Sequence, residues 1–262
     1  MRRRLIVLAA VAVTVLPGCS SGGPAHATGG APAPAVSVSG APAVAHSPAS
    51  PYRIPTFPAA PVPVPIKLAP GASAPFLSRI PTTQRVAFLT IDDGFVKTAD
   101  GPKLIAAAHI PVTLFLTLNA IKDNPGYFAP MQHNGAVIEA HTITHSELRG
   151  KPYAFQRNEI CGSADKLGRW YQRRPVLFRP PFGDKDANTL RAAHDCGMRA
   201  VFMWKETVDK GIVRYQEGHS IKPGDIILMH FRPAFVKDFL AALQAIHRAG
   251  LTPALLEDYI PA

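Results

Sequence analysis

Two adjacent carboxylates, Asp92 and Asp93, follow directly on an apolar run in this 262-residue chain. Residues 85–91 are predicted to form a buried strand, because the run is short and rich in β-branched side chains. Neighbouring strand residues point to opposite faces, so two acids inside such a strand would place a charge in the core. At the strand's end, Gly94 lets the chain turn and both carboxylates can face one pocket. Sites in α/β folds are built at such ends; a plain Asp-Asp-Gly turn is the alternative.

Two histidines four residues apart, His141 and His145, follow the short apolar run at 136–138. Imidazoles at this spacing suit one helical turn or a tight loop, and they can bind one ion. The pair alone is weak evidence, since a surface helix produces it by chance. Together with Asp93 it forms a set of two histidines and one carboxylate, which leaves positions open for water and substrate.

Two further apolar runs also end in polar groups. The run at 176–178 is followed by Arg179-Pro-Pro-Phe-Gly183, in which the paired prolines hold a rigid loop and the glycine permits a backbone amide to point into the site. The run at 225–229 is followed by His230. Four separate strand ends that each present a polar group are poorly explained by chance.

Apolar runs alternate with helix-like stretches along the rest of the chain. We expect strands at 112–116, 136–138, 176–178, 200–203, 225–229 and 251–255, and helices at 101–109, 152–172, 186–196 and 233–249. This alternation favours an α/β fold with a parallel sheet or barrel.

The formal charge of +10 is concentrated near the N-terminus. Six of the 28 basic residues and none of the 18 acidic residues lie in residues 1–84, which leaves 22 basic and 18 acidic residues beyond them. No basic stripe or aromatic-interleaved patch follows, so we expect no nucleic-acid partner. Mild attraction to an anionic surface such as a cell wall is compatible with this charge.

The N-terminal segment indicates export. Residues 1–18 hold a basic start and an apolar stretch too short to span a membrane, which is typical of a signal peptide. The sequence around Cys19 resembles a bacterial lipobox, which predicts an acylated Cys19 and a lipoprotein on the extracellular side of the cell membrane. Cleavage after Ala27, giving a secreted protein, is the alternative. Residues 19–84, rich in Ala and Pro, predict a disordered linker, and residues 85–262 one folded domain.

Cys161 and Cys196 lie in two separate predicted helices of an exported chain. They could form a disulfide or remain two buried thiols. The sequence leaves both readings open.

The order and spacing of Thr90–Gly94, His141–His145, Arg179–Gly183 and Leu228–His230 resemble the motifs of the NodB-homology polysaccharide deacetylases (carbohydrate esterase family four). The resemblance covers essentially all of residues 85–260. It implies a distorted (β/α) barrel of about seven strands and the removal of acetyl groups from N-acetylated sugars. It also implies a divalent metal, usually Zn²⁺, with Co²⁺ or a similar ion as the alternative.

The same resemblance implies roles for the polar motif residues. Asp93, His141 and His145 would hold the metal. Asp92 would be the general base, and Arg179 would orient it and pair with its charge. A nearby cation of either kind favours the ionised form of a carboxylate, which a base must retain.

The remaining motif residues would serve the acetyl group and the leaving amine. By the resemblance, Leu228 and Trp204 would line the acetyl pocket and His230 would be the general acid, a role that suits a histidine titrating near ambient pH. The backbone N–H of Phe182 could stabilise the oxyanion of the tetrahedral intermediate.

One position departs from the family pattern. Members usually carry an acid three residues after the tryptophan, where it pairs with the catalytic histidine, but Thr207 occupies that place after Trp204. Asp209, or less readily Glu206, would substitute for it. Otherwise His230 has no acidic partner, and its basicity and the reaction rate should be lower.

These observations predict an exported, monomeric, metal-dependent N-deacetylase of aminosugar polymers such as peptidoglycan or chitin-like oligosaccharides. One alternative is an acetyl esterase or amidase on the same scaffold. Another is a weakly active wall-binding lipoprotein, a reading that Thr207 motivates.

Overall fold

The eight-residue strand β2 (Val86–Asp93) lies inside the sheet and is buried along its whole length. The structure is a computed structural model, and it describes residues 51–261. β2 pairs in parallel with β3 (Val112–Leu116) on one side and with β9 (Ile226–His230) on the other. A strand buried on both faces needs a nearly continuous apolar run, which residues 86–91 supply.

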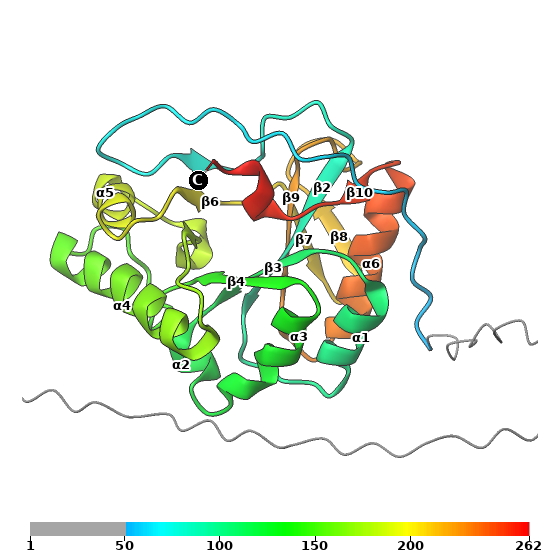
Figure 1. Ribbon diagram of the computed structural model, residues 1–262, viewed down its shortest axis with the longest axis horizontal. Helices are drawn as coiled ribbons and strands as arrows, with labels where there is room; N and C mark the ends of the chain where they lie inside the picture. Colours follow the sequence, from blue (N-terminus) through cyan, green and yellow to red (C-terminus); the bar gives the residue numbers. More distant parts are fainter. Residues whose placement is uncertain (1–50, 262) are drawn as a thin grey trace, which may run out of the picture. The chain divides into compact units, whose positions relative to one another are not determined.

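The sheet is a parallel array that curls into an incomplete barrel (Figure 1). Its strand order is β1-β6-β5-β4-β3-β2-β9-β7-β8, and the pair β7–β8 is antiparallel. A short strand, β10, pairs with the start of β2. The strands not yet given are β1 (Phe76–Leu77), β4 (Ala136–Ala140), β5 (Leu177–Phe178), β6 (Ala200–Phe202), β7 (Glu206–Asp209), β8 (Ile212–Tyr215) and β10 (Thr252–Pro253). The predicted α/β fold is confirmed, and seven parallel strands from β6 to β7 form the curl.

Four helices occupy the predicted stretches to within two residues at each end. They are α1 (Asp100–Ala108), α4 (Tyr153–Tyr171), α5 (Ala187–Asp195) and α6 (Phe235–Arg248). The apolar stripe of α6 is buried against the sheet side, as its helical spacing predicts. Shorter helical turns were not predicted: α2 (Leu118–Ile121), α3 (Ala129–His133), η1 (Pro125–Phe128), η2 (Pro181–Gly183) and η3 (Leu256–Tyr259).

The register of the parallel strands brings their carboxyl ends to one edge. Asp92 on β2 pairs with His230 on β9, and Asp93 pairs with Leu116 at the end of β3. Leu116 pairs in turn with Ala140 on β4, and Ala140 with Phe178 on β5. The polar residues that follow these strands therefore start from the same edge of the sheet.

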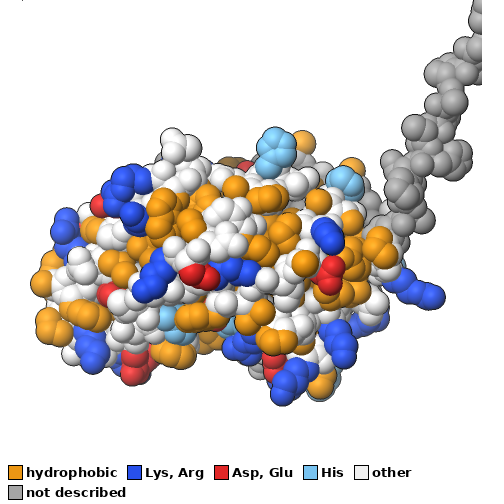
Figure 2. Space-filling view, turned by 90° about the horizontal axis from the view of Figure 1, so that it is seen from below, with side chains coloured by type: hydrophobic (Ala, Val, Ile, Leu, Met, Phe, Trp, Pro, Cys, Tyr) orange, Lys and Arg blue, Asp and Glu red, His pale blue; other side chains and the backbone are white. Residues whose placement is uncertain are grey.

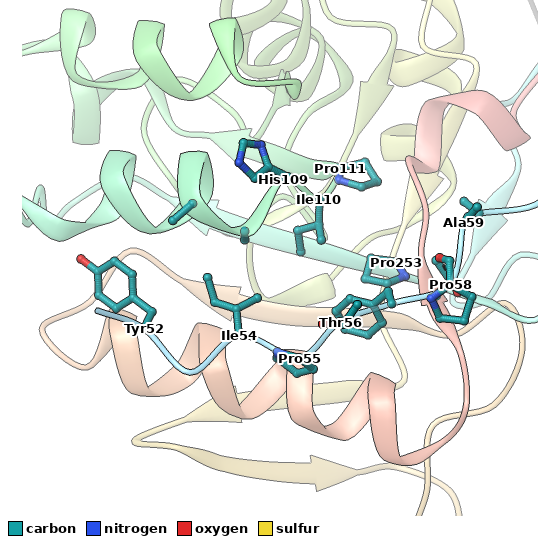
Figure 3. A pocket seen from close by; sticks show the side chains of 15 residues that line it. Tyr52, Ile54, Pro55, Thr56, Pro58, Ala59, His109, Ile110, Pro111 and Pro253 are labelled. Carbon is teal, nitrogen blue, oxygen red and sulfur yellow. Dashed lines mark hydrogen bonds between the residues drawn. The ribbon is translucent and has the colours of Figure 1, made fainter. Parts of the chain in front are cut away.

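Residues 51–84, here called the N-terminal strap, belong to the folded unit, and this corrects the predicted linker boundary. β1 in the strap pairs with β6, and Ala74 and Ile80 are buried. Figure 3 shows the beginning of the strap beside the end of α1 and β10, where it borders a cavity of about 570 Å³. The prediction was wrong for 51–84 because a proline-rich chain without helical or strand periodicity can still be anchored by individual apolar side chains that the domain buries. The signal peptide, Cys19 and the linker predicted for 20–50 lie outside the described residues.

The hairpin β7–β8 was also missed. Its strands are joined by Lys210 and Gly211, which have φ values of 54° and 79°. Two consecutive positive φ values are the mark of a two-residue hairpin turn that matches the strand twist. The Lys-Gly pair between two alternating four-residue segments was the available signal.

Cys161 on α4 and Cys196 at the end of α5 form a disulfide, with their Cα atoms 5.0 Å apart. The structure thus decides between the two alternatives that the sequence left open. Within residues 51–261, no helix is both long and apolar enough to cross a membrane. On the face shown in Figure 2, basic side chains are scattered among acidic, polar and apolar ones and do not gather into a stripe.

Candidate active site and metal centre

The two carboxylates at the end of β2 face one pocket, as the sequence predicted. Asp93 has a φ of 77°, which departs from the extended backbone of the strand and allows adjacent side chains to share a side. Gly94 follows with a φ of 100°, and a Cβ atom there would lie 2.4 Å from Cγ2 of Ile121. Only glycine fits at this turn.

The histidine pair lies in a tight loop after β4, one of the two arrangements expected. Thr142 and His145 both have positive φ values, 71° and 60°. Glu159 on α4 holds the loop, because its Oε2 accepts from the backbone N–H groups of Ile143 at 3.0 Å and Thr144 at 2.9 Å. The Thr142 hydroxyl accepts from the His145 N–H at 3.0 Å. These bonds stabilise a backbone shape that is otherwise costly for residues with a side chain.

Three potential metal ligands converge at this edge. Nε2 of His145 lies 3.1 Å, and Nε2 of His141 3.5 Å, from Oδ1 of Asp93, and the three ligand atoms lie within 4.8 Å of one another. Oδ1 of Asp93 is buried and accepts no hydrogen bond. Nδ1 of His141 is 2.6 Å from the carbonyl oxygen of Arg179, so Nδ1 carries the proton and the Nε2 of a neutral imidazole presents its lone pair. An imidazole lone pair that faces a buried carboxylate oxygen is an arrangement that can bind a cation between the two groups.

The electrostatics of the three groups agree with that fit. Burial raises the pKa of Asp93, but the favourable interactions with the neighbouring imidazoles of His141 and His145 outweigh it, so the pKa lies well below its usual range. Burial lowers the pKa of His141, and the carboxylates of Asp92 and Asp93 overcome this and raise it. The centre therefore attracts positive charge, which protons or a divalent ion can supply.

Asp92 is held from the other side by a fully buried arginine. Nη1 of Arg179 donates to Oδ1 of Asp92 at 2.7 Å and to the Thr90 hydroxyl at 2.8 Å. The guanidinium lies 4.3 Å from the ring centre of Phe115 and 5.7 Å from that of Trp204. Burial lowers the pKa of Arg179, and the charge of Asp92 opposes the shift. The pair is a buried charge pair with fixed geometry.

A cavity of about 330 Å³ contains these groups. Its lining includes nearly all the predicted site residues: Asp92, Asp93, His141, His145, Phe182, Trp204, Leu228 and His230. Arg179 lies beneath it. The Phe182 ring is 65% exposed and meets the His145 ring edge-on at 4.9 Å between centroids, and its φ is 62°. The structure thus places these predicted site residues together around one cavity.

His230 has no acidic hydrogen-bond partner among the described residues. Oδ1 of Asp209, predicted to serve, instead accepts from Nη1 of Arg232 at 3.4 Å. Glu206 is buried and interacts with Asp225, away from the cavity. Burial lowers the pKa of His230; Asp92 and Asp93 oppose the shift, and the charge of Arg232 adds to it. The predicted substitution by Asp209 is therefore wrong.

Three residues of the site were not singled out from the sequence. Glu159 supports the histidine loop by accepting hydrogen bonds from its backbone. The Thr90 hydroxyl accepts a hydrogen bond from the Arg179 guanidinium, and Arg232 lines the cavity beside His230. Thr90 and Arg232 are close in sequence to predicted residues and could have been considered. Glu159 gives no such signal, because one polar residue on a long helix is ordinarily solvated.

The sequence comparisons match most of the domain. Residues 79–201 match the family model described as polysaccharide deacetylase. Uncharacterized protein SCO4760 of Streptomyces coelicolor is 38% identical over 192 residues, which is 71% of this chain and 77% of that protein. Peptidoglycan-N-acetylmuramic acid deacetylase PdaA of Bacillus subtilis is 26% identical over 162 residues. That alignment covers 57% of this chain and 61% of PdaA, less than two thirds of its length.

A solved structure supports the fold. The Bc1960 peptidoglycan N-acetylglucosamine deacetylase superposes with a TM-score of 0.60 and 22% identity, over 72% of this chain and 93% of that one. At this level of identity the likeness shows the fold of the chain. From the family model, the relative of 38% identity and the shared fold, we conclude that the chain belongs to the polysaccharide deacetylase family.

Proposed function

We propose that the protein is a metal-dependent hydrolase that removes N-acetyl groups from aminosugar polymers, peptidoglycan or chitin-like oligosaccharides. One observation carries the proposal: Asp93, His141 and His145 converge on a common point beside the buried Asp92–Arg179 pair, in a cavity that also holds His230. The relatives named as deacetylases of peptidoglycan and chitooligosaccharides support the substrate class.

The metal would be held by Asp93 Oδ1 and by the Nε2 atoms of His141 and His145. A donor set of two imidazoles and one carboxylate suits Zn²⁺, with Co²⁺ as the alternative. When bound, such an ion polarises the acetamide carbonyl and lowers the pKa of water towards about 7. The hydrogen bond from His141 Nδ1 to the carbonyl of Arg179 fixes the ring and its tautomer.

The other residues move protons and position the substrate. Oδ1 of Asp92 accepts from Arg179, which leaves Oδ2 to accept a proton from the attacking water. His230, next to Asp92 across the β2–β9 ladder, protonates the leaving amine. Leu228 and Trp204 enclose the methyl group, and the backbone N–H of Phe182 is the candidate donor to the developing oxyanion.

Acetate release tests the function. The purified chain, loaded with zinc, is incubated with peptidoglycan and with N-acetylglucosamine oligomers, and Asp92→Asn is assayed beside it. Acetate from the parent chain and none from Asp92→Asn at equal zinc content is the expected result. No acetate from the zinc-loaded parent would contradict N-deacetylation of these polymers.

An acetyl esterase is the second candidate, and the setting of His230 favours it. In the part of the chain that the structure describes, His230 has no acidic hydrogen-bond partner, and burial and Arg232 both lower its pKa. An ester's leaving group depends less on protonation than an amine does, so a histidine that is less often protonated would harm ester hydrolysis less. Acetylated xylan in the same assay distinguishes the two.

The location of the protein is part of the proposal. Acylation of Cys19 would tether it to the extracellular side of the cell membrane, and cleavage after Ala27 would release it. Labelling with a fatty-acid analogue in the parent chain and in Cys19→Ala distinguishes these outcomes. We further propose that the domain acts as a monomer, which sedimentation of the purified chain tests.

A further inference from the structure

The β7–β8 hairpin reaches the cavity through Thr207, and the face of the hairpin that carries Thr207 is called the wall below. Thr207 lines the cavity and lies directly across the hairpin from Arg214, while Asp209 lies across from Ile212. Alternate strand residues and directly opposed partners share a face, so these four side chains belong to the face that borders the cavity. The other face is partly buried and packs against α6.

Arg232 joins this wall from the chain just beyond β9. It lines the cavity two residues after His230, and its side chain is 48% exposed. Within residues 51–261, its ion-pair partner is Asp209, through a single contact of 3.4 Å from Nη1. A guanidinium has five N–H donors, so most of its donors remain available to a ligand in the cavity.

The wall carries more positive than negative charge. Arg214 is exposed and, among the described residues, takes part in no ion pair, while Asp209 is the one acid on the face. Directly opposed residues have Cβ atoms about 5 Å apart, so the Arg214 side chain begins close to Thr207 at the cavity. Two arginines thus stand against one carboxylate among the cavity-facing side chains of the wall, while Asp238, which also interacts with Arg232, lies on α6.

We propose that Arg232, assisted by Arg214, binds a carboxylate carried by the aminosugar whose acetyl group is removed. The substrate class is then an acidic N-acetylated aminosugar polymer, of which N-acetylmuramic acid units are an example, and this inference rests on the proposed function. His230 is placed to meet the amine at the reacting carbon, and Arg232 lies two residues further on. A carboxylate carried through an ether oxygen on the neighbouring ring carbon lies within a few bonds of that amine.

Charge complementarity gives selectivity against neutral polymers. An arginine binds a carboxylate with two parallel hydrogen bonds, which neutral sugar hydroxyls cannot reproduce. A neutral chitin-like chain would leave the two guanidinium groups without that partner. The carboxylate could belong to the sugar itself or to a peptide attached to it, and both sources present the same group.

The test compares glycan strands that differ only in charge. Peptide-free strands that contain N-acetylmuramic acid are assayed beside the same strands with their carboxyl groups reduced to alcohols. Acetate release gives kcat/KM for each, and the readout is the ratio of the two values. Peptide-bearing strands are a third arm that distinguishes the two sources of carboxylate, and mass spectrometry identifies the sugar that lost its acetyl group.

The parent chain should prefer the carboxylated strands by at least about tenfold, the factor expected for one charge-assisted hydrogen bond at a half-exposed site. Arg232→Gln should bring the ratio close to one, and Arg214→Gln should lower it by a smaller factor. Arg248→Gln, an exposed arginine at the end of α6, is the matched control and should keep the parent ratio. Thermal unfolding and zinc content verify that each variant is folded and loaded.

Two results would overturn the inference: a parent ratio near one for the peptide-free and the peptide-bearing strands alike, or an Arg232→Gln variant that loses activity equally on carboxylated and reduced strands. Acetyl loss confined to N-acetylglucosamine units would overturn it as well. A preference seen with peptide-bearing strands alone supports the proposal and assigns the carboxylate to the peptide. Failure of the proposed function is a different result, namely no acetate from any strand by the zinc-loaded parent.

Discussion

Nδ1 of His141 lies 2.6 Å from the carbonyl oxygen of Arg179, so the loop after β5 fixes the orientation and the tautomer of a histidine in the loop after β4. The carbonyl accepts a hydrogen bond from Nδ1–H and so directs the Nε2 lone pair towards Asp93, while the side chain of the same arginine donates to Asp92 at 2.7 Å. Arg179 therefore positions the candidate base with its guanidinium and one candidate metal ligand with its backbone.

Removing either imidazole should abolish tight zinc binding. We expect His141→Ala and His145→Ala to weaken zinc binding by more than the about 10- to 100-fold that loss of a supporting hydrogen bond costs. Isothermal titration with zinc measures the affinity. His133→Ala, an exposed histidine on α3, is the control and should bind zinc like the parent chain. Equal affinity in His145→Ala would show that the ion, if any, is held elsewhere.

Breaking the Asp92–Arg179 pair should cost stability as well as activity. Arg179→Ala leaves the Asp92 charge buried without its partner, so the free energy of unfolding should fall by about 3–5 kcal/mol. Arg174→Ala is a matched control, because that arginine forms a largely exposed pair with Asp165, whose loss should cost at most about 1 kcal/mol. Denaturant titration measures both. Equal small losses would mean that the buried pair is not a fixed charge pair.

The sequence predicted the strand ends well because their position follows from elementary rules. Apolar runs identify buried strands, parallel strands align their carboxyl ends, and polar residues just beyond them must meet. Asp92, Asp93, His141, Arg179 and His230 follow from that reasoning and lie as predicted. A local pattern was enough because each residue directly adjoins the strand that places it.

The sequence predicted the structure less well where contacts between distant parts of the chain determine the position of a side chain. Glu159 supports the histidine loop from a helix that starts after it, and no local pattern aims its side chain there. Asp209 was expected to meet His230, but pairing in the hairpin and the proximity of Arg232 give it another partner. The apolar residues of the N-terminal strap follow no helical or strand periodicity, and only the folded domain shows that Ile80 is one of its anchors.

A buried carboxyl away from the cavity should make stability depend on pH. Burial, and next the negative charge of Asp225, raise the pKa of Glu206 to about 9. In the unfolded chain a glutamate titrates near its ordinary value of about 4.3, so between about pH 4 and pH 9 the folded state binds the extra proton. The contribution of Glu206 to stability is therefore present at low pH and lost as pH rises through the folded pKa.

Glu206→Gln should remove that dependence, because the amide keeps a donor for Asp225 and cannot ionise. Relative to the parent chain, we expect this variant to gain on the order of 5 kcal/mol in unfolding free energy between pH 5 and pH 9. Denaturant titration at the two pH values measures the change. Glu217→Gln, at a half-exposed glutamate nearby, is the control. Parallel pH profiles for the parent and Glu206→Gln would contradict the raised pKa.

The N-terminal strap should contribute to the stability of the domain, although its composition resembles that of a linker. Ile80 is fully buried, and its N–H donates to the carbonyl of Gly224 at 2.8 Å. Ile80→Ala should lower the free energy of unfolding by about 2–4 kcal/mol, because the cavity it leaves is bordered by the core. Val62→Ala is the control within the same strap: Val62 is 85% exposed, so its loss should change stability by less than about 0.5 kcal/mol. Equal effects of the two substitutions, measured by denaturant titration, would mean that the strap does not pack on the domain in solution.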